Sequence, residues 1–249
     1  MRTRRKALLL TMCAALLVAG SIIGTVAYLT DSAEVKNTFT VGKVGLTLDE
    51  AKVNEAGQPL DKDNKVVARE DADRWTPTTS DPTQKYHLLP GHEYTKDPTV
   101  TVTADSEDAY VRMLATITYD EGADKVFAQY KNDNLFAPWL DINAAWKVVG
   151  TKHVTTKTTD TETGKVTVSR TYEFRYWDAA NDTDKIVAHS DDATKLPALF
   201  TTLAIPGELT NAEIATLEGM EIKVVAHAIQ ASGFADAGAA WAAFDTQNS

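Results

Sequence analysis

The residues best able to hold a metal are five histidines, and their spacing does not form a ligand set. The stretch HEYTK, beginning at His92, starts like the helix of a zinc protease, in which a second histidine one turn later completes the metal site. Lys96 stands at that position instead, and Pro90 and Pro98 disfavour a long helix around it. We therefore expect no zinc centre. The histidines are His87, His92, His153, His189 and His227.

Two acidic runs, TADSEDAY and HSDDATK, carry carboxylates of the kind that bind calcium. Neither run has the spacing or the central glycine of an EF-hand, so solvated loops are the expected structure and calcium binding stays open.

The chain has no G-x-S-x-G motif and no glycine-rich phosphate loop. The sequence thus predicts a protein that is not an enzyme, with no cofactor, no metal site and no catalytic residues.

The first 30 residues have the pattern of a signal peptide. A basic cluster precedes residues 7–30, which are uncharged and strongly apolar. Small residues gather near the end, and Thr25 and Ala27 suit the −3 and −1 pockets of a signal peptidase, so we expect cleavage between Ala27 and Tyr28. Since about 20 apolar residues span a bilayer, a retained anchor is the alternative. Cys13, the only cysteine, is expected to be apolar filler here, not a lipidation site.

The charge of the mature chain would be strongly negative. The whole chain has a net charge of −10, and four of its 25 basic residues precede the apolar run. After cleavage 21 basic and 35 acidic residues would remain, a net charge of −14. Such a surface repels nucleic acid and anionic lipid, so we expect no nucleic-acid partner, and membrane contact only through an uncleaved signal peptide.

Alternating apolar residues recur in four segments, with the period of half-buried strands. His227 has the opposite phase to the apolar residues of its segment, which predicts an exposed or edge position. Because an antiparallel sheet needs a second layer over its apolar face, the alternation predicts an all-β fold, a jelly-roll-like two-sheet β-sandwich over residues 28–249, preceded by a signal peptide helix over residues 1–27. The alternating sets are Val44, Leu46 and Leu48; Val100, Val102 and Ala104; Ala109, Val111, Met113, Ala115 and Ile117; and Ile222, Val224, Ala226 and Ala228.

A hairpin is predicted by VTTKTTDTETGKVTVSRTYEFRYW, in which the polar residues 160–164 separate two arms rich in threonine and valine. The second arm directs Tyr172, Phe174 and Tyr176 to one face. Aromatic residues at a period of two most often form a packed face. We therefore expect these rings to be part of the core and not a ligand platform.

Two short helices and one acidic excursion complete the expected elements. LTNAEIATLEG has a capping residue at Thr210 or Asn211, and FADAGAAWAAFD could bury Trp241 and Phe244. Residues 49–84 are charged, poorly periodic and rich in turn residues. They predict a surface excursion between the first two core strands, with room for a small hairpin.

Several short motifs, taken in order, resemble one family. GTVAYLTDSAEVKNTFTVGKVGLTL, followed by YHLLPGHEYTKDPTVTVTADSEDAYVRM, is similar to the TasA/camelysin-like surface proteins of Gram-positive bacteria, whose signal peptides are cut by a SipW-type signal peptidase. The resemblance extends over nearly the whole chain apart from the acidic excursion. The family pattern G-T-x-A-[YF]-[FL]-[ST]-D, then N-x-F-T-x-G, matches residues 24–31 and Asn37, Phe39, Thr40 and Gly42.

The resemblance implies a jelly-roll protein secreted to the cell surface or extracellular matrix, where members assemble into biofilm fibres. In such fibres the freed N-terminal segment is thought to lie in a neighbouring subunit as an extra strand. The metalloprotease label of camelysin would transfer only with its metal ligands, and no such pattern is found in this sequence.

The residues supply a physical reason for strand donation. The edge of a sheet exposes unpaired N–H and C=O groups, which an extended segment of another chain can satisfy. Residues 28–41 form such a segment, and their release would await removal of the leader. An ordinary first strand within the same sandwich, or a flexible lead-in, is the alternative. The donor-strand candidates are Leu29, Ala33, Val35, Phe39 and Val41, which share one parity.

Three functional hypotheses follow. The first is a secreted, non-enzymatic surface or matrix protein that polymerises head to tail with itself after signal cleavage. The second is a camelysin-like secreted metallopeptidase. The third is a minor anchoring or binding subunit that docks onto a filament of another protein, so an accessory fibre subunit is a possible partner.

Overall fold

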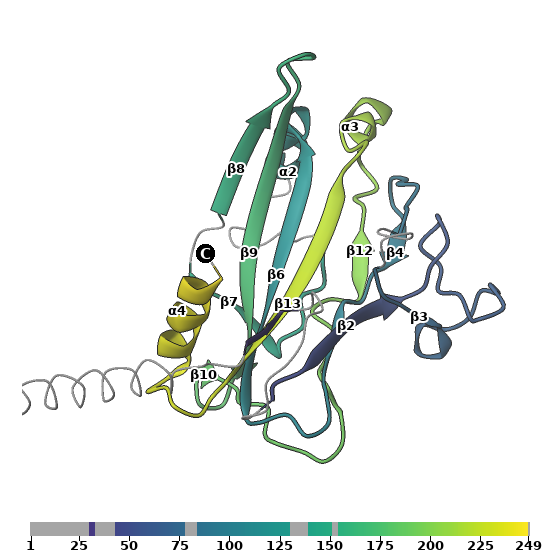
Figure 1. Cartoon of the computed structure of the whole chain (residues 1–249). Helices are drawn as coiled ribbons and strands as arrows, with labels where there is room; N and C mark the ends of the chain where they lie inside the picture. Colours follow the sequence, from purple (N-terminus) through teal and green to yellow (C-terminus); the bar gives the residue numbers. More distant parts are fainter. Residues whose placement is uncertain (1–29, 33–42, 78–83, 130–138, 151–153, 249) are drawn as a thin grey trace, which may run out of the picture.

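A computed structural model describes residues 30–32, 43–77, 84–129, 139–150 and 154–248. These residues form mostly antiparallel β-structure with a few short helices (Figure 1). The expectation of a β-sheet protein with short helices is therefore confirmed. Residues 1–27, expected to be the signal peptide, lie outside the described residues.

The largest sheet has seven strands and is built around three long ones, β13, β6 and β9 (Figure 1). On the far side of β9, three short strands pair in succession, so that edge is covered along most of its length. On the far side of β13 only β1 pairs among the described residues. The strands are β1 (Thr30–Ser32), β13 (Glu221–Gln230), β6 (Ala109–Asp120), β9 (Val166–Asp178), β8 (Val154–Thr159), β7 (Trp146–Val148) and β10 (Thr183–Asp184).

Two smaller antiparallel sheets share a core with the large one. One has the order β11, β5, β2, β3, and the other pairs β12 with β4. Their strands are β2 (Leu46–Ala51), β3 (Arg74–Trp75), β4 (Glu93–Thr95), β5 (Thr99–Val102), β11 (Thr194–Lys195) and β12 (Thr202–Ala204). The helices are η1 (Arg69–Asp71), η2 (Glu121–Ala123), α2 (Asp124–Gln129), α3 (Asn211–Ala215) and α4 (Ala237–Gln247).

The alternation along β6 decides where the core lies. Val111, Met113 and Ile117 are buried, whereas Thr116 and Thr118, on the opposite face, are partly exposed. Burying the alternate apolar side chains is worth about 1.5 to 3 kcal/mol for each large one, which fixes the register because a one-residue slip would expose them. The core also contains Tyr94, Val100, Phe174, Phe200 and Leu203 from the other strands and loops.

The predicted hairpin and helices are confirmed. β8 and β9 form the hairpin, and Asp160 accepts hydrogen bonds from backbone N–H groups in its turn. Tyr172 and Phe174 are buried in the core. The hydroxyl group of Thr210 caps α3 in a capping box with Glu213.

Helix α4 covers part of the outer face of the seven-stranded sheet, beside β13. Trp241 and Phe244 pack there in a second apolar cluster with Ile229 of β13. Asp236 caps the start of the helix by accepting a hydrogen bond from the N–H of Ala239. The burial of Trp241 and Phe244 expected from the sequence is therefore confirmed.

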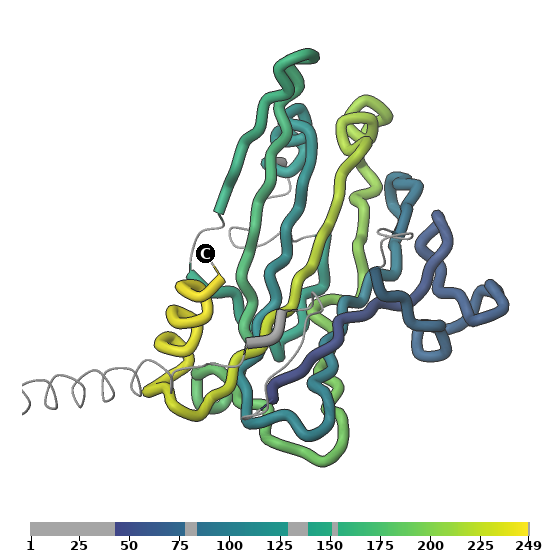
Figure 2. Tube along the Cα trace, in the orientation of Figure 1, coloured from purple at the N-terminus to yellow at the C-terminus, as the bar shows by residue number. Residues whose placement is uncertain are grey.

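The acidic excursion comprises residues 52–77 and residue 84 in the described part of the chain, since residues 49–51 belong to β2. Its loops project from the body on the side of β2 and β3 (Figure 2). Isolated bridges join Val53 to Pro59 and Leu60 to Val66. Arg74 holds the excursion to the body through ion pairs with the carboxylates of Asp49 and Asp97, with N–O distances of 2.7 and 2.8 Å.

Candidate strand-accepting edge

Most of the N-terminal residues singled out from the sequence lie outside the described residues. The described part of that segment is β1, which pairs antiparallel with the end of β13 in the same chain. Thr30 lies opposite Ile229 and Ser32 opposite His227. This is the pairing expected of an ordinary first strand. Outside the described residues are Thr25, Ala27, Tyr28, Leu29, Ala33, Val35, Phe39 and Val41.

Beyond β1, the outer edge of β13 presents backbone groups with no described strand beside them. Ala231, just after β13, donates its N–H to the carbonyl of Asp108, on the side of β6. Alternate residues of an antiparallel strand direct their N–H and C=O groups to opposite sides. The groups of Ile222, Val224 and Ala226 therefore face away from β6. β1 reaches only residues 227–229.

The same reasoning finds a second open edge on β2. The N–H of Thr103 donates to the carbonyl of Gly45, which sets the phase of the β2–β5 ladder. Leu46, Leu48 and Glu50 therefore direct their backbone groups away from β5. β3 pairs with Glu50 and Ala51, and no described strand pairs with Leu46 or Leu48 on that side.

The two strands that carry the open edges are neighbours, because β2 contacts β13. The side chains of Ile222 and Val224 are half-buried against the core, as is Leu48. Glu221 and Lys223, on the opposite face of β13, are exposed. An added strand would thus find hydrogen-bonding groups with no described partner strand, apolar neighbours on its inner face and charged neighbours on its outer face. This combination is what recognition by strand addition requires.

The histidines do not assemble a metal centre in the described part of the chain. His227 lies on the face opposite Ala226, as its phase predicts, but it is half-buried instead of exposed because α4 covers that face. Its Nδ1 accepts a hydrogen bond of 3.3 Å from Nε of Arg112, and its ring stacks on Phe244 at 4.7 Å. Burial, reinforced by the Arg112 charge and opposed by Asp245 and Glu173, lowers the pKa of His227 to about 4.

The two acidic runs lie side by side. The N–H of Asp105 donates to the carbonyl of Ser190, and the N–H of His189 donates to the carboxylate of Asp108. The Nδ1 atom of His189 lies 2.7 Å from the carbonyl oxygen of Ser106. This hydrogen bond, together with the nearby acidic side chains, raises the pKa of His189. Among the described residues, no group of three histidine, cysteine, aspartate or glutamate side chains is arranged to hold a metal ion.

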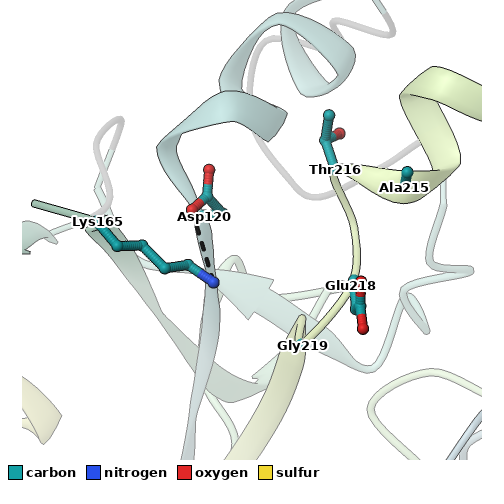
Figure 3. A pocket seen from close by; sticks show the side chains of 6 residues that line it. All are labelled: Asp120, Lys165, Ala215, Thr216, Glu218 and Gly219. Carbon is teal, nitrogen blue, oxygen red and sulfur yellow. Dashed lines mark ion pairs between the residues drawn. The ribbon is translucent and has the colours of Figure 1, made fainter. Parts of the chain in front are cut away.

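A hollow of about 430 Å³ lies between the ends of β6 and β9 and the turn after α3 (Figure 3). Asp120 and Lys165 face each other across one side of it at 3.7 Å. Thr216 offers the only hydroxyl group of its lining, and this hydroxyl donates to the carbonyl of Glu213. The lining thus contains no activated nucleophile with a neighbouring base.

In the part of the chain that the structure describes, no helix combines the length and apolar character needed to cross a bilayer. Comparisons with models of known families, with curated proteins and with solved structures found no match to this chain.

Sequence reasoning missed the meeting of β2 and β13, because it depends on how two sheets pack. It also missed a buried ion pair between Glu50 and Lys96. One signal for this pair was available: Glu50 has the same parity as Leu46 and Leu48, which indicates a carboxylate at a position that faces the core.

Proposed function

We propose that this chain is a secreted, non-enzymatic surface or matrix protein that polymerises by strand addition at the outer edge of β13. The observation that carries the proposal is the edge itself: Ile222, Val224 and Ala226 turn backbone groups outward with no described strand beside them. The same edge already accepts an antiparallel strand at residues 227–229.

The register of β1 suggests how a neighbouring copy would dock. If the N-terminal segment of the neighbouring copy took the place of β1 and continued along β13 in the same register, its Ala33 would lie opposite Ala226 and its Val35 opposite Val224. Residues opposite each other in an antiparallel pair share a face, and this face is the one that packs against the core. The parity of the donor-strand candidates therefore agrees with the inner face of the edge.

The burial of apolar side chains would favour such a contact. Burying Leu29, Val35, Phe39 and Val41 would each contribute about 1.5 to 3 kcal/mol before ordering and association costs. A head-to-tail contact that does not close into a ring extends into a filament. The polymer proposal also agrees with the resemblance to the TasA/camelysin-like family, which implies a jelly-roll arrangement of the sheets.

The proposal includes a step that controls assembly. A SipW-type signal peptidase would cut between Ala27 and Tyr28, and the donor segment would leave the membrane only then. Export would thereby be coupled to polymerisation in the extracellular matrix or on the cell surface. The strongly negative charge of the cut chain argues against nucleic acid as a partner.

Electron microscopy tests this proposal. Protein that starts at Tyr28 should form filaments, and protein that starts after Thr40 should stay monomeric. Val35→Glu should prevent filaments because it would place a charge on the inner face, whereas the adjacent Lys36→Glu, on the outer face, should permit them.

Val224→Glu tests the accepting strand, with thermal unfolding as the check that the variant folds. If the Tyr28 form stays monomeric at high concentration, polymerisation is refuted. A monomer that binds a filament of another protein would instead identify an accessory subunit.

A further inference from the structure

A buried lysine and glutamate lie where β2 meets the segment between β4 and β5. Glu50 and Lys96 are each only 7% exposed. The Lys96 Nζ atom lies 2.8 and 2.9 Å from the two carboxylate oxygens of Glu50. Removing both charges from water is costly, and an ion pair recovers that cost incompletely. Transfer of one proton along this hydrogen bond converts the pair into a neutral amine and a neutral acid.

The carboxylate of Glu50 also contacts an amide. Gln84 Nε2 lies 3.4 Å from Glu50 Oε2 and donates to the carbonyl of Ala51 at 3.0 Å. Gln84 Oε1 accepts a hydrogen bond of 2.8 Å from the backbone N–H of Val53. Glu50 thus stands between an amine and a carboxamide, and a fixed donor polarises the carbonyl group of that carboxamide.

Neighbouring groups hold Lys96, Glu50 and Gln84 in this arrangement. Arg74 binds the carboxylate of Asp97, so this charge is already paired and does not compete for Lys96. Tyr86 is half-buried, and its hydroxyl group donates to the carbonyl of Thr95 at 3.2 Å. Burial, reinforced by the nearby carboxylates of Glu50 and Asp97, raises the pKa of Tyr86, which therefore stays neutral.

We propose that Lys96 and Gln84 join in an intramolecular isopeptide bond, with Glu50 as the group that moves protons between them. Glu50 takes a proton from the Lys96 ammonium group, and the neutral Nζ attacks Cδ of Gln84. The Nζ–Cδ bond forms while the N–H of Val53 stabilises the charge on Oε1. The Cδ–Nε2 bond then breaks, and nitrogen leaves as ammonia. One of its three protons comes from Lys96 by way of Glu50, which keeps the second Lys96 proton as a neutral acid, and no oxidant is needed.

The bond would remove a buried charge and close a loop. The isopeptide nitrogen is neutral, so the desolvation cost of the ammonium group disappears. The link would tie the end of the acidic excursion to the strand region around Lys96. Apart from Cys13 the chain has no cysteine, so this chemistry offers a covalent cross-link where a disulfide is impossible.

Intact mass spectrometry of denatured protein starting at Tyr28 tests the proposal. The mass should be lower than the sequence mass by one ammonia molecule. Tryptic digestion should yield residues 75–85 joined to residues 86–112, because trypsin cannot cleave after a modified Lys96. The same form with Lys96→Met should have its full sequence mass. Lys85→Met, an exposed lysine next to Gln84, should keep the ammonia loss.

Glu50→Gln tests the proton-transfer role of Glu50, because this variant keeps both residues that would form the bond, Lys96 and Gln84. A folded variant, verified by circular dichroism, should show the full sequence mass. Full mass in the unmodified protein after days at neutral pH would overturn the proposal. Loss of one water with a Lys96–Glu50 link would also overturn it, because Glu50 would then be the acyl group. The wild-type measurement decides the matter even if Glu50→Gln does not fold.

Discussion

Trp241 offers the sharpest test of how α4 is held on the sheet. Its side chain is 1% exposed, and the guanidinium carbon of Arg112 lies 4.5 Å from the ring centroid. Trp241→Ala would remove the largest side chain of the second apolar cluster. Such truncations cost about 3 to 5 kcal/mol, a large part of the roughly 5 to 15 kcal/mol that stabilises a domain.

Trp241→Phe separates packing from hydrogen bonding. The buried indole N–H finds no acceptor among the described residues, and an unsatisfied buried donor costs about 1 to 3 kcal/mol. Phenylalanine loses some buried area and weakens the contact with Arg112, but it also removes that donor. We therefore expect Trp241→Phe to change the free energy of unfolding by less than about 1 kcal/mol.

Urea unfolding followed by far-ultraviolet circular dichroism measures both variants, with the m-value as the check for two-state behaviour. The exposed Ala242→Gly in the same helix is the control for helix propensity, at about 1 kcal/mol. If Trp241→Phe were as costly as Trp241→Ala, the relief of an unsatisfied N–H would be wrong. If Trp241→Ala had no effect, α4 would not be docked as described.

Three further predictions concern local features. The pKa of His227 in the folded protein, about 4, lies below its ordinary value of 6.5. The free energy of unfolding should therefore fall as the pH drops from about 6.5 to 4. Urea unfolding across this range should show a smaller fall for His227→Gln than for the unmodified protein. Gly57 has φ of 72°, and a Cβ there would lie 2.7 Å from Cα of Tyr94. Gly164 has a similar φ of 71°, but a Cβ there would meet no atom within 4 Å. Gly57→Ala should therefore lower the melting temperature much more than Gly164→Ala. Thr210→Ala should cost about 1 kcal/mol and speed hydrogen exchange in α3.

The strands and short helices could be predicted because their signals are local. The alternation from Ala109 to Ile117 requires one face to be buried, and that requirement is met by β6. Thr210 and Glu213 form their capping box within four residues. These elements depend on neighbours in sequence, so the chain itself carries the information.

The arrangement of the site depends on contacts far apart in sequence. Glu50 and Lys96 are 46 residues apart, and Arg112 and Asp245 are 133 apart. No periodicity links such positions. His227 illustrates the limit: its phase correctly predicts the face of β13 on which it lies, but whether that face is exposed depends on where α4 docks.

The two halves of β2 have different surroundings, and this difference bears on assembly. At Glu50 and Ala51 the strand is paired with β3 and fixed by Lys96 and by Arg74 through Asp49. At Leu46 and Leu48 the outward edge has no described strand beside it. β2 contacts β13, the accepting strand that we propose, and a neighbouring strand that is held rigid at one end loses little conformational entropy when a donor strand docks beside it. The isopeptide bond that we propose would strengthen this effect, so a Lys96→Met variant that still folds should polymerise more weakly than the unmodified protein.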